Sequence, residues 1–484
     1  MSVPRLRNYI GGEWVGGESG TVGAVMNPAL DEVIAEVPLC GRQEVDAAVS
    51  AANEAFWDWR CTPPVTRARY MLRLKELLER DFEQLARTVT EENGKVIDEA
   101  RGEVRRCIEN VETAIGIPTL MMGYNSEDIA EGIDEEVVRQ PLGVFACIAP
   151  FNFPAMVPFW FLPYAVAAGN TYVIKPSPQT PVSQSKLVAL MEEAGFPPGV
   201  VGLVNGANEA ADALLEHPHV RGVSFVGSTP VGKHIYQKAC ENGKRAQCQC
   251  GAKNFLVVMP DASLDRSVAA IMTSAYGCAG ERCLAGSLVV AVGDVYGPLR
   301  AKLLDAASSL RVGYGLDESV HMGPVVSRKA QQRIVGYVDK GVEEGAKLLL
   351  DGRNIKVEGY PRGYFVGPTV FDDVDPAMTV AKDEIFGPVL GIIRVSSFDQ
   401  ALALIDAVPY GNAASLFTGS GKWAREFKYR VACGNIGINL GIAAPMSFFP
   451  FGGQKQSFFG DLHGQGQDAV RFFTDSKVVI TRWL

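Results

Sequence analysis

One cysteine of the chain lies in a setting that suits nucleophilic chemistry. Cys283 stands among small residues in segment 280–287 and directly follows Arg282. A neighbouring guanidinium favours the thiolate, which is the reactive form of a thiol. A single cysteine is more often a small buried hydrophobic residue, so this adjacency alone is a weak signal. The segment still predicts a candidate for covalent catalysis at Cys283.

Segment 225–232 could hold a phosphate. Its residues suit a strand end followed by a tight turn, which Gly227 permits. Ser228 or Thr229 can cap the helix that follows, and Pro230 fits its first turn. Free backbone N–H groups at such a helix start favour an anion. The segment is not a G-x-G-x-x-G fingerprint, and an ordinary capped helix is an equally good interpretation of it alone.

The histidines and cysteines give no support to a metal site. The five histidines offer Cys283 no evident partner and show no zinc spacing. Cys248 and Cys250 lie too close together and too isolated to bind a metal. Ten cysteines over so long a chain suit a reducing compartment, in which thiols stay free. We therefore expect no metal.

The composition is that of a soluble globular protein. Of 484 residues, 47% are hydrophobic and 21% are charged, and the length predicts two or three domains. The 46 basic and 55 acidic residues give a net charge of −9, without the Lys/Arg runs that bind a phosphate backbone. Nucleic acid is therefore not an expected partner.

No segment suggests a membrane role. Residues 1–14 lack the apolar core of a secretory signal, which favours a cytoplasmic location. Segment 143–169 is apolar, but a continuous lipid-facing helix is not expected because polar and proline residues interrupt it. These residues are Pro150, Asn152, Pro154, Pro158 and Pro163.

Hydrophobic periodicity predicts the elements that position these residues. Helical spacing dominates from Glu44 to Ile117, with Gly94 as a helix end and a further helix after Val96. Strands then alternate with helices, which predicts a parallel sheet covered on both faces. The strands are expected at 143–148, 171–174, 200–204 and 222–226, and the helices begin near Val182, Ala207 and Pro230.

The alternation restarts after Asn254 and predicts a second α/β domain. Strands are expected at 256–259, 288–292 and 389–395, with a long helix at 329–344. Segments 125–139 and 470–483 look like extended ribbons outside either core. Because isolated ribbons usually pair with another segment, another subunit is a candidate partner for them.

Seven segments together resemble the aldehyde dehydrogenase superfamily, in that family's order and over nearly the whole chain. They are residues 151–154, 174–177, 227–229, 251–254, 280–287, 384–388 and 450–453. The resemblance implies a Rossmann-like NAD-binding domain (1–124 and 140–250), an α/β catalytic domain (251–448) and a small β oligomerisation ribbon (125–139 and 449–484). A homotetramer is the family habit, with a dimer as the alternative.

The resemblance also implies roles for the site residues. Cys283 would attack the aldehyde carbonyl, and the Asn152 amide and the Cys283 backbone N–H would hold the oxyanion. Hydride transfer to the nicotinamide would leave a thioester. The adenosine ribose would be bound by Lys175, the pyrophosphate by Ser228 and the nicotinamide ribose by Glu384. The other implied cofactor-binding positions are Ala149, Phe151, Pro178, Gln179, Gly227 and Phe386.

One departure from the family pattern concerns release of the acyl group. Most hydrolytic members have a glutamate where this chain has Gln249, and a glutamine cannot accept a proton at neutral pH. Hydrolysis of the thioester by water should therefore be slow. Coenzyme A is the expected acceptor of the acyl group, because exchange of one thioester for another is nearly isoenergetic. The chain resembles the acylating subgroup that converts malonate or methylmalonate semialdehyde to acetyl- or propionyl-coenzyme A with loss of carbon dioxide.

A substrate that carries a carboxylate calls for a guanidinium near the thiol. Arg282 meets this need by adjacency, and the resemblance adds Arg106. Periodicity would not have chosen Arg106, because it lies opposite the Val104 and Ile108 stripe, where a solvated helix face is usual. The enolate left by carbon dioxide can rest in the oxyanion hole, and no metal is required.

Three questions stay open at the level of sequence. A hydrolytic semialdehyde dehydrogenase would make a free acid instead, although Gln249 argues against it. A relative without catalytic activity would have a binding or structural role, although the presence of Cys283, Asn152 and Glu384 together argues against that role. Pro178 stands where many NAD-dependent relatives have a glutamate that repels a 2′-phosphate, so NAD is expected while NADP stays open.

Overall fold

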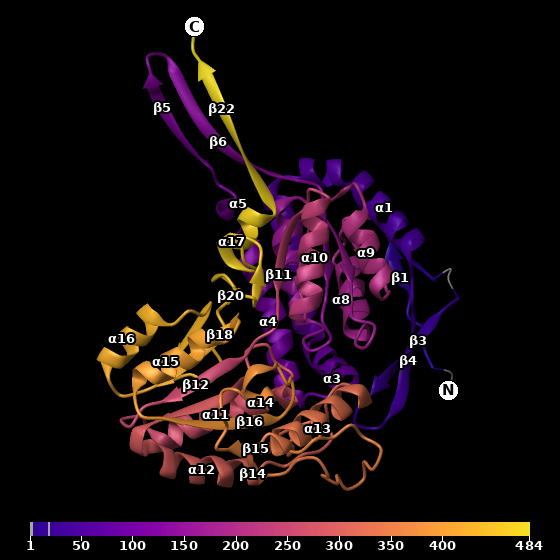
Figure 1. The fold of residues 1–484 in the computed structure, drawn as a ribbon. Coiled ribbons are helices and arrows are strands. Elements are labelled where there is room, and N and C mark those ends of the chain that lie inside the picture. The colour runs from indigo at the N-terminus through magenta and orange to yellow at the C-terminus, as the bar shows by residue number, and fades with distance from the viewer. Residues whose placement is uncertain (1–2, 18–19) are drawn as a thin grey trace.

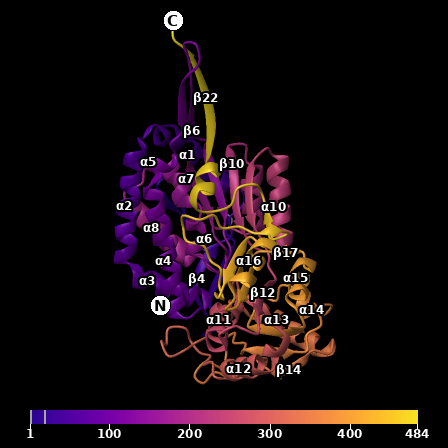
Figure 2. The same ribbon diagram turned by 90° about the vertical axis from the view of Figure 1, so that its left-hand side faces the viewer.

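The computed structural model describes residues 3–17 and 20–484. Two α/β sheets lie beside each other, and a three-stranded arm projects from the side of the first sheet that faces away from the second (Figures 1 and 2). The two predicted α/β units are confirmed. No helix among the residues described is long and apolar enough to cross a membrane.

The first sheet has eight strands in the order β2-β1-β9-β8-β7-β10-β11-β21. Its five central strands are parallel: β9 (Val201–Leu203), β8 (Thr171–Lys175), β7 (Val144–Ile148), β10 (Val220–Val226) and β11 (Arg245–Gln249). The edge strands are antiparallel: β1 (Asn8–Ile10), β2 (Glu13–Val15) and β21 (Phe458–Phe459). The strand order reverses at β7, and ligands of such sheets bind outside the carboxyl ends of the strands at that point.

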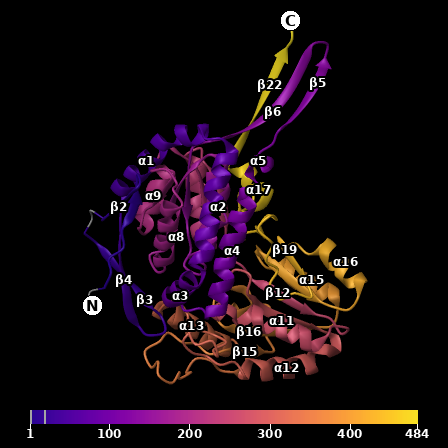
Figure 3. The same ribbon diagram turned by 180° about the vertical axis from the view of Figure 1, so that it is seen from behind.

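Helices cover both faces of this sheet, as predicted. On one face lie α1 (Arg42–Cys61), α9 (Asn208–Glu216) and α10 (Thr229–Glu241), and on the other lie α2 (Pro64–Arg80), α4 (Ile97–Ile115), α7 (Leu162–Ala168) and α8 (Val182–Glu193) (Figures 1 and 3). Gly94 ends α3 (Phe82–Asn93) in the left-handed conformation, as predicted. The chain breaks at Asp81, so the single helix expected to carry Leu74, Leu78 and Leu85 up to Gly94 forms two helices, α2 and α3.

The second sheet has seven strands in the order β14-β15-β16-β13-β12-β18-β19. All neighbours are parallel except the pair of β14 (Lys347–Leu350) and β15 (Thr369–Asp372). The others are β16 (Val389–Val395), β13 (Gly286–Val292), β12 (Asn254–Val258), β18 (Ala413–Phe417) and β19 (Asn435–Ile438). The helices of this unit are α11 (Leu264–Tyr276), α12 (Tyr296–Ser308), α13 (Arg328–Glu343), α14 (Thr379–Lys382), α15 (Phe398–Ala407) and α16 (Gly421–Arg430).

The arm pairs β22 (Thr474–Arg482) with β6 (Ile133–Pro141), which pairs in turn with β5 (Tyr124–Ala130). The C-terminal ribbon begins later than predicted, because Gly466–Phe472 forms helix α17 and Phe472 and Phe473 are buried against Phe145. The remaining elements are β3 (Val22–Asn27), β4 (Glu32–Pro38), α5 (Ile117–Leu120), α6 (Met156–Phe159), β17 (Tyr410–Gly411), β20 (Gln454–Lys455) and the 3-10 helices η1 (Gly277–Gly280) and η2 (Gly293–Val295).

The connection between the two sheets decides where a site can form. The chain leaves the carboxyl end of β11 at Gln249 and enters the amino end of β12 at Asn254, only four residues of linker later. Neighbouring parallel strands all end at the same edge of a sheet. Because the linker is so short, the carboxyl edge of the first sheet meets the amino edge of the second. Side chains from both sheets can therefore converge on one place.

Candidate active site

The predicted site residues lie along this shared edge. Those of the first sheet follow its strands: Ala149 and Asn152 follow β7, Lys175 ends β8, and Gly227 follows β10. Those of the second sheet precede its strands: Cys283 comes before β13, and Glu384 and Phe386 come before β16. These residues from distant parts of the sequence therefore lie together because the edges of the two sheets meet.

The loop that carries the predicted nucleophile turns sharply before it reaches Cys283. Helix α11 ends at Tyr276, and Cys278, Ala279 and Gly280 then take positive φ values of 49°, 50° and 74°. At Gly280 only glycine fits, because a Cβ there would lie 2.2 Å from the carbonyl oxygen of Gly387. The nucleophile loop is therefore seated directly on the segment that carries Glu384.

Two side-chain amides bind the main chain at Cys283. The carbonyl oxygen of Cys283 accepts hydrogen bonds from Asn254 Nδ2 and Asn412 Nδ2, each at 2.8 Å. Asn254 Nδ2 also donates to the carbonyl oxygen of Ala285 at 2.9 Å, and its Oδ1 accepts from the backbone N–H of Ala413. The backbone around Cys283 is fixed from the amino edge of the second sheet.

The surroundings of Cys283 favour its neutral thiol. Burial and, to a smaller extent, the nearby carboxyl of Glu384 raise the pKa of Cys283 to about 12, whereas the backbone N–H groups of Cys283 and Leu284 act in the opposite direction. Arg282 lowers this pKa only as a minor contribution. The thiolate that the adjacency of Arg282 suggested is therefore not the resting form, because desolvation outweighs the neighbouring cation.

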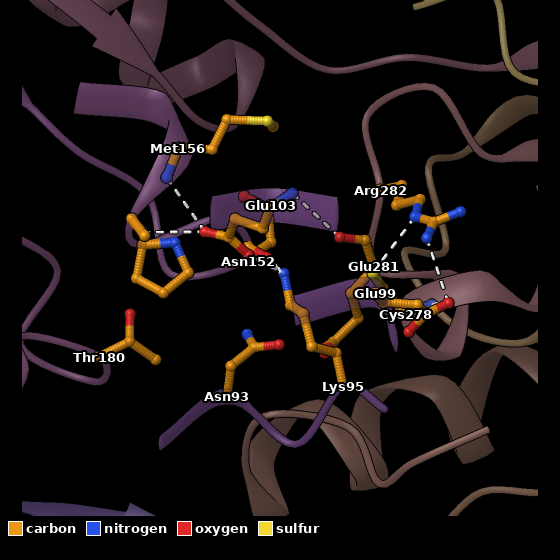
Figure 4. A network of polar contacts seen from close by, with 12 residues as sticks. Asn93, Lys95, Glu99, Glu103, Asn152, Met156, Thr180, Cys278, Glu281 and Arg282 are labelled. Carbon is orange, nitrogen blue, oxygen red and sulfur yellow. Dashed lines mark hydrogen bonds and ion pairs between the residues drawn. The ribbon is translucent and has the colours of Figure 1, made fainter. Parts of the chain in front are cut away.

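Asn152 reaches the nucleophile loop from the first sheet. Its Nδ2 donates to the carbonyl oxygen of Glu281 at 2.9 Å, two residues before Cys283 (Figure 4). Its own carbonyl oxygen accepts from Lys95 Nζ at 2.7 Å. The structure thus brings the predicted amide donor and the predicted nucleophile loop into contact.

Gln249 is buried at the end of β11. Its Nε2 donates to the carbonyl oxygen of Phe451 at 3.3 Å, and its Oε1 has no hydrogen-bond partner in the described part of the chain. Glu281, the carboxyl closest in sequence to the nucleophile, has a pKa raised to about 8 by burial, and its Oε2 accepts from the backbone N–H of Val326. Among described residues no group of three or more His, Cys, Asp or Glu could hold a metal ion.

The positions predicted for the adenosine half of a dinucleotide lie beside one surface pocket between α9 and α10. The pocket is lined by Lys175, Pro178, Ala211, Pro230, Val231 and Ile235, among others. Lys175 Nζ donates to the carbonyl oxygens of Pro176 and Gly206, and burial lowers the pKa of Lys175 to about 8. Gln179 is exposed, and its backbone N–H donates to Ser177 Oγ.

The start of α10 has the geometry that the sequence predicted. Ser228 is the N-cap residue and Pro230 lies in the first turn, while the Ser228 side chain makes no capping bond to any described residue. Thr229 Oγ1 instead accepts from the backbone N–H of Gly251 at 3.0 Å. N–H groups of this helix start therefore remain for an anionic ligand.

Glu384 and the two phenylalanines Phe151 and Phe386 lie where the two sheets meet. Glu384 Oε1 accepts from the backbone N–H of Ala252 at 2.9 Å, and burial raises the pKa of Glu384 to about 7. Phe386 has a positive φ of 54°, and its ring meets Phe151 edge to face at 5.9 Å between centroids. These side chains link the carboxyl edge of the first sheet to the amino edge of the second.

Each of the two arginines expected to bind a substrate carboxylate contacts a glutamate carboxylate of α4. Arg106 Nη1 donates to Glu109 Oε2 at 2.8 Å and to Met446 Sδ at 3.1 Å. Arg282 Nη2 donates to Glu99 Oε1 at 3.1 Å, and its Nε donates to Cys278 Sγ at 3.2 Å. Arg282 is thus directed along its own loop and toward α4, whereas Arg106 is half-buried beside the segment that carries Met446.

Several residues that build the site were missed. Asn412, Lys95 and Glu103 carry no motif in the sequence, and each acts through a backbone group of a predicted residue or of its neighbours. One signal was available for Glu103: it lies between Ala100 and Cys107 at helical spacing, on the buried side of α4. A charged residue on an apolar stripe indicates a buried partner.

The whole chain is similar to known proteins. The model of the aldehyde dehydrogenase family matches residues 14–479. Malonate-semialdehyde dehydrogenase 2 of Geobacillus kaustophilus is 50% identical over 481 residues, with 99% of each chain covered. The structure of methylmalonate-semialdehyde dehydrogenase from Oceanimonas doudoroffii is 45% identical with a TM-score of 0.98, covering 100% of this chain and 99% of that one. A Sinorhizobium meliloti protein complexed with NAD is 43% identical with a TM-score of 0.99, covering 100% and 99%.

Proposed function

Because the chain belongs to the aldehyde dehydrogenase family, we propose that it oxidises malonate or methylmalonate semialdehyde with NAD and transfers the acyl group to coenzyme A, with loss of carbon dioxide. The observation that carries this proposal is that the Asn152 amide donates to the carbonyl oxygen of Glu281, two residues before the half-buried Cys283, while Gln249 stands where a base would activate water. The names of the similar enzymes support the substrate class.

Acylation begins at Cys283. Once deprotonated, its sulfur forms a bond to the aldehyde carbon, and the carbonyl π electrons move to the oxygen. The Asn152 Nδ2 and the Cys283 backbone N–H stabilise the resulting oxyanion. When the C=O bond re-forms, the hydride leaves and a thioester remains on Cys283. NAD, when bound, supplies the acceptor for that hydride.

The residues at the cleft fit a dinucleotide. The buried Lys175 ammonium borders a pocket that α9 and α10 line with apolar side chains, which suits an adenosine. Ser228 and Gly227 begin a helix whose N-terminus suits a pyrophosphate, and the Glu384 carboxyl suits ribose hydroxyls. Because Pro178 carries no charge, NADP could bind at the same place, and NAD remains the proposed cofactor.

Coenzyme A is the proposed acyl acceptor. Its thiolate would attack the thioester carbon, the bond to Cys283 would break, and the Cys283 sulfur would leave as a thiolate. Decarboxylation would precede this transfer, while the acyl group is still bound to Cys283: the bond between the α carbon and the carboxylate breaks, carbon dioxide leaves, and the electron pair of that bond forms an enolate that the Asn152 amide can stabilise before the α carbon takes up a proton. Gln249 has no ionisable group, so it gives water no comparable advantage.

Arg106 and Arg282 are the proposed ligands of the substrate carboxylate. Both guanidiniums are already within hydrogen-bond distance of a glutamate, at 2.8 Å for Glu109 and 3.1 Å for Glu99. A substrate carboxylate would therefore exchange with, or share, an existing partner rather than meet a bare cation. Because Arg106 is more exposed than Arg282, we assign it the first contact.

The arm is the proposed contact between subunits. Its strands expose the large apolar side chains of Tyr124, Val478 and Ile480, and Trp483 follows directly after β22, all four at 58% to 76% of full exposure. An exposed strand pair of this kind is a template for pairing with another chain. We propose a homo-oligomer, with a tetramer favoured, and the division into an NAD-binding domain, a catalytic domain and an oligomerisation arm remains part of the proposal.

One assay tests the function. Purified protein is given malonate or methylmalonate semialdehyde, with NAD or NADP, and with or without coenzyme A, and the products are identified by mass spectrometry. We expect NADH with acetyl- or propionyl-coenzyme A. Free malonate as the main product would support the hydrolytic alternative instead, and the absence of any aldehyde-dependent NADH would support a non-catalytic role.

A further inference from the structure

We propose that the buried ion pair of Lys95 and Glu103 positions the amide of Asn152. The inference rests on the proposed function of Asn152 as an oxyanion donor and adds two positioning residues to it. Neither Lys95 nor Glu103 lies among the reacting groups, and both act through the backbone of the segment that follows β7.

That segment has little regular structure of its own. Between the end of β7 at Ile148 and the start of α6 at Met156 the chain forms no strand or helix, so no ladder of backbone hydrogen bonds fixes Asn152. Several of its carbonyl groups are held by side chains instead. Phe151 O accepts from Asn93 Nδ2 at 3.0 Å and from Thr180 Oγ1 at 3.2 Å.

The ion pair makes the charged contacts to this segment (Figure 4). Lys95 Nζ contacts Glu103 Oε2 at 2.5 Å and donates to Asn152 O at 2.7 Å. Glu103 Oε1 accepts from the backbone N–H groups of Ala155 at 2.8 Å and Met156 at 3.1 Å. Lys95 Nζ also lies 3.9 Å from the ring centroid of Phe153. One pair therefore holds both ends of the five residues 152–156.

Burial makes these contacts stiff. Both side chains of the pair have 0% exposure, so water does not compete for their hydrogen bonds. A buried ion pair adds little to stability compared with apolar residues of the same volume, because desolvation offsets the attraction. Its spare hydrogen bonds all go to the Asn152 segment, which is what a positioning role requires.

Position matters at Asn152 more than at its neighbours. Its Nδ2 must meet a developing oxyanion at Cys283, and in the free protein it rests on the Glu281 carbonyl at 2.9 Å. A donor that stabilises a transition state acts only when it is aimed beforehand, and a displacement of about 1 Å can lower a rate about 100-fold. Lys95 donates to the main-chain carbonyl oxygen of Asn152, so it can fix the position of this residue.

A double-mutant cycle tests this inference. The rate of NADH formation in a single turnover is measured for wild type, Lys95→Met, Asn152→Ala and the combined variant. We expect Asn152→Ala to lower the rate by about 100- to 1000-fold and Lys95→Met by about 10- to 100-fold. Since Lys95 acts through Asn152, the combined variant should be no slower than Asn152→Ala alone. The Kd for NAD should stay unchanged in all three.

Two controls separate positioning from general damage. Glu92 is an equally buried carboxyl that accepts from Val182 N and Ser183 N, away from Asn152, so Glu92→Gln should leave the single-turnover rate unchanged. If Lys95→Met does not fold, the variant Lys95→Met/Glu103→Gln removes both charges together and leaves no unpaired ion. It then takes the place of Lys95→Met in the cycle.

The outcomes are distinguishable. Equal loss from Lys95→Met in the wild-type and Asn152→Ala backgrounds would overturn the positioning role, and so would an unchanged rate in Lys95→Met. In both cases a slow Asn152→Ala protein would leave the proposed function standing. An unchanged rate in Asn152→Ala would instead reject the oxyanion role of Asn152 and the inference with it.

Discussion

Arg106 donates a 2.8 Å hydrogen bond to Glu109, one turn further along α4. The guanidinium proposed to receive the substrate carboxylate thus has a carboxylate of the protein as its partner in the free state. Substrate binding is then an exchange of one carboxylate for another, and its strength depends on how firmly Glu109 holds its place.

The first prediction concerns this exchange. Arg106→Leu should raise the KM for malonate semialdehyde about 10- to 100-fold, because a hydrogen bond to a charged group contributes about 1.5–3 kcal/mol. Glu109→Gln should lower the same KM by freeing the guanidinium. Steady-state kinetics with propanal, which has no carboxylate, serve as the control. An unchanged KM for malonate semialdehyde in Arg106→Leu would refute the assigned role.

The second prediction concerns the reactivity of Cys283. Since burial and Glu384 keep the pKa of the thiol at about 12, iodoacetamide should label Cys283 slowly at pH 8 in the free protein. Glu384→Gln should accelerate labelling, because it removes the carboxylate that raises the pKa of the thiol. Peptide mapping by mass spectrometry measures the rate, with exposed Cys61 as an internal control. Slower labelling of Glu384→Gln would contradict the electrostatic cause.

The third prediction concerns Gln249. Gln249→Glu should introduce a base that activates water, and general-base catalysis contributes about 100- to 10,000-fold. The variant should therefore turn over without coenzyme A and release free acid, and Gln249→Ala, which adds no base, is the matched control. Product analysis by mass spectrometry decides. If Gln249→Glu still requires coenzyme A, the residue does not account for the choice of acceptor.

The fourth prediction concerns the pH dependence of NAD binding. Burial raises the pKa of Glu384 to about 7, and the ionised form is the better acceptor for ribose hydroxyls. Binding therefore favours the carboxylate, so the Kd for NAD should rise as pH falls below 7, by at most about tenfold per unit. Fluorescence titration between pH 6 and 8.5 measures this. Glu384→Gln should bind more weakly with a flat profile, and a retained slope would point to another group.

Much of the fold could be predicted because the pattern of apolar residues is local information. Strands such as β7 and β10 are buried runs between turn residues, and α8 and α10 begin close to where Val182 and Pro230 predicted. The break at Asp81 could not be predicted, since Leu77, Leu78 and Leu85 continue one helical spacing across it. The pairing of Phe458–Phe459 with β11 was also beyond the sequence, because it depends on contacts distant along the chain.

The site also contains residues that the sequence could predict and others that it could not. Cys283, Asn152 and Glu384 lie in segments whose types and order are distinctive, and the structure brings their loops together at one edge. The partners of the arginines could not be predicted. Glu99 and Glu109 are ordinary helix glutamates in the sequence, and only the packing of α4 against the nucleophile loop brings Glu99 to Arg282. Electrostatic partners require three-dimensional distances that spacing does not supply.

The four-residue passage from β11 to β12 has a consequence for assembly of the enzyme. Asn152 follows a strand of the first sheet and Cys283 precedes a strand of the second, so neither half of the molecule contains both parts of the proposed oxyanion hole. Catalytic activity therefore requires the two halves to be packed together, and folding of each half by itself is not sufficient. On gradual heating, turnover should disappear once the interface loosens, while each half still keeps its secondary structure.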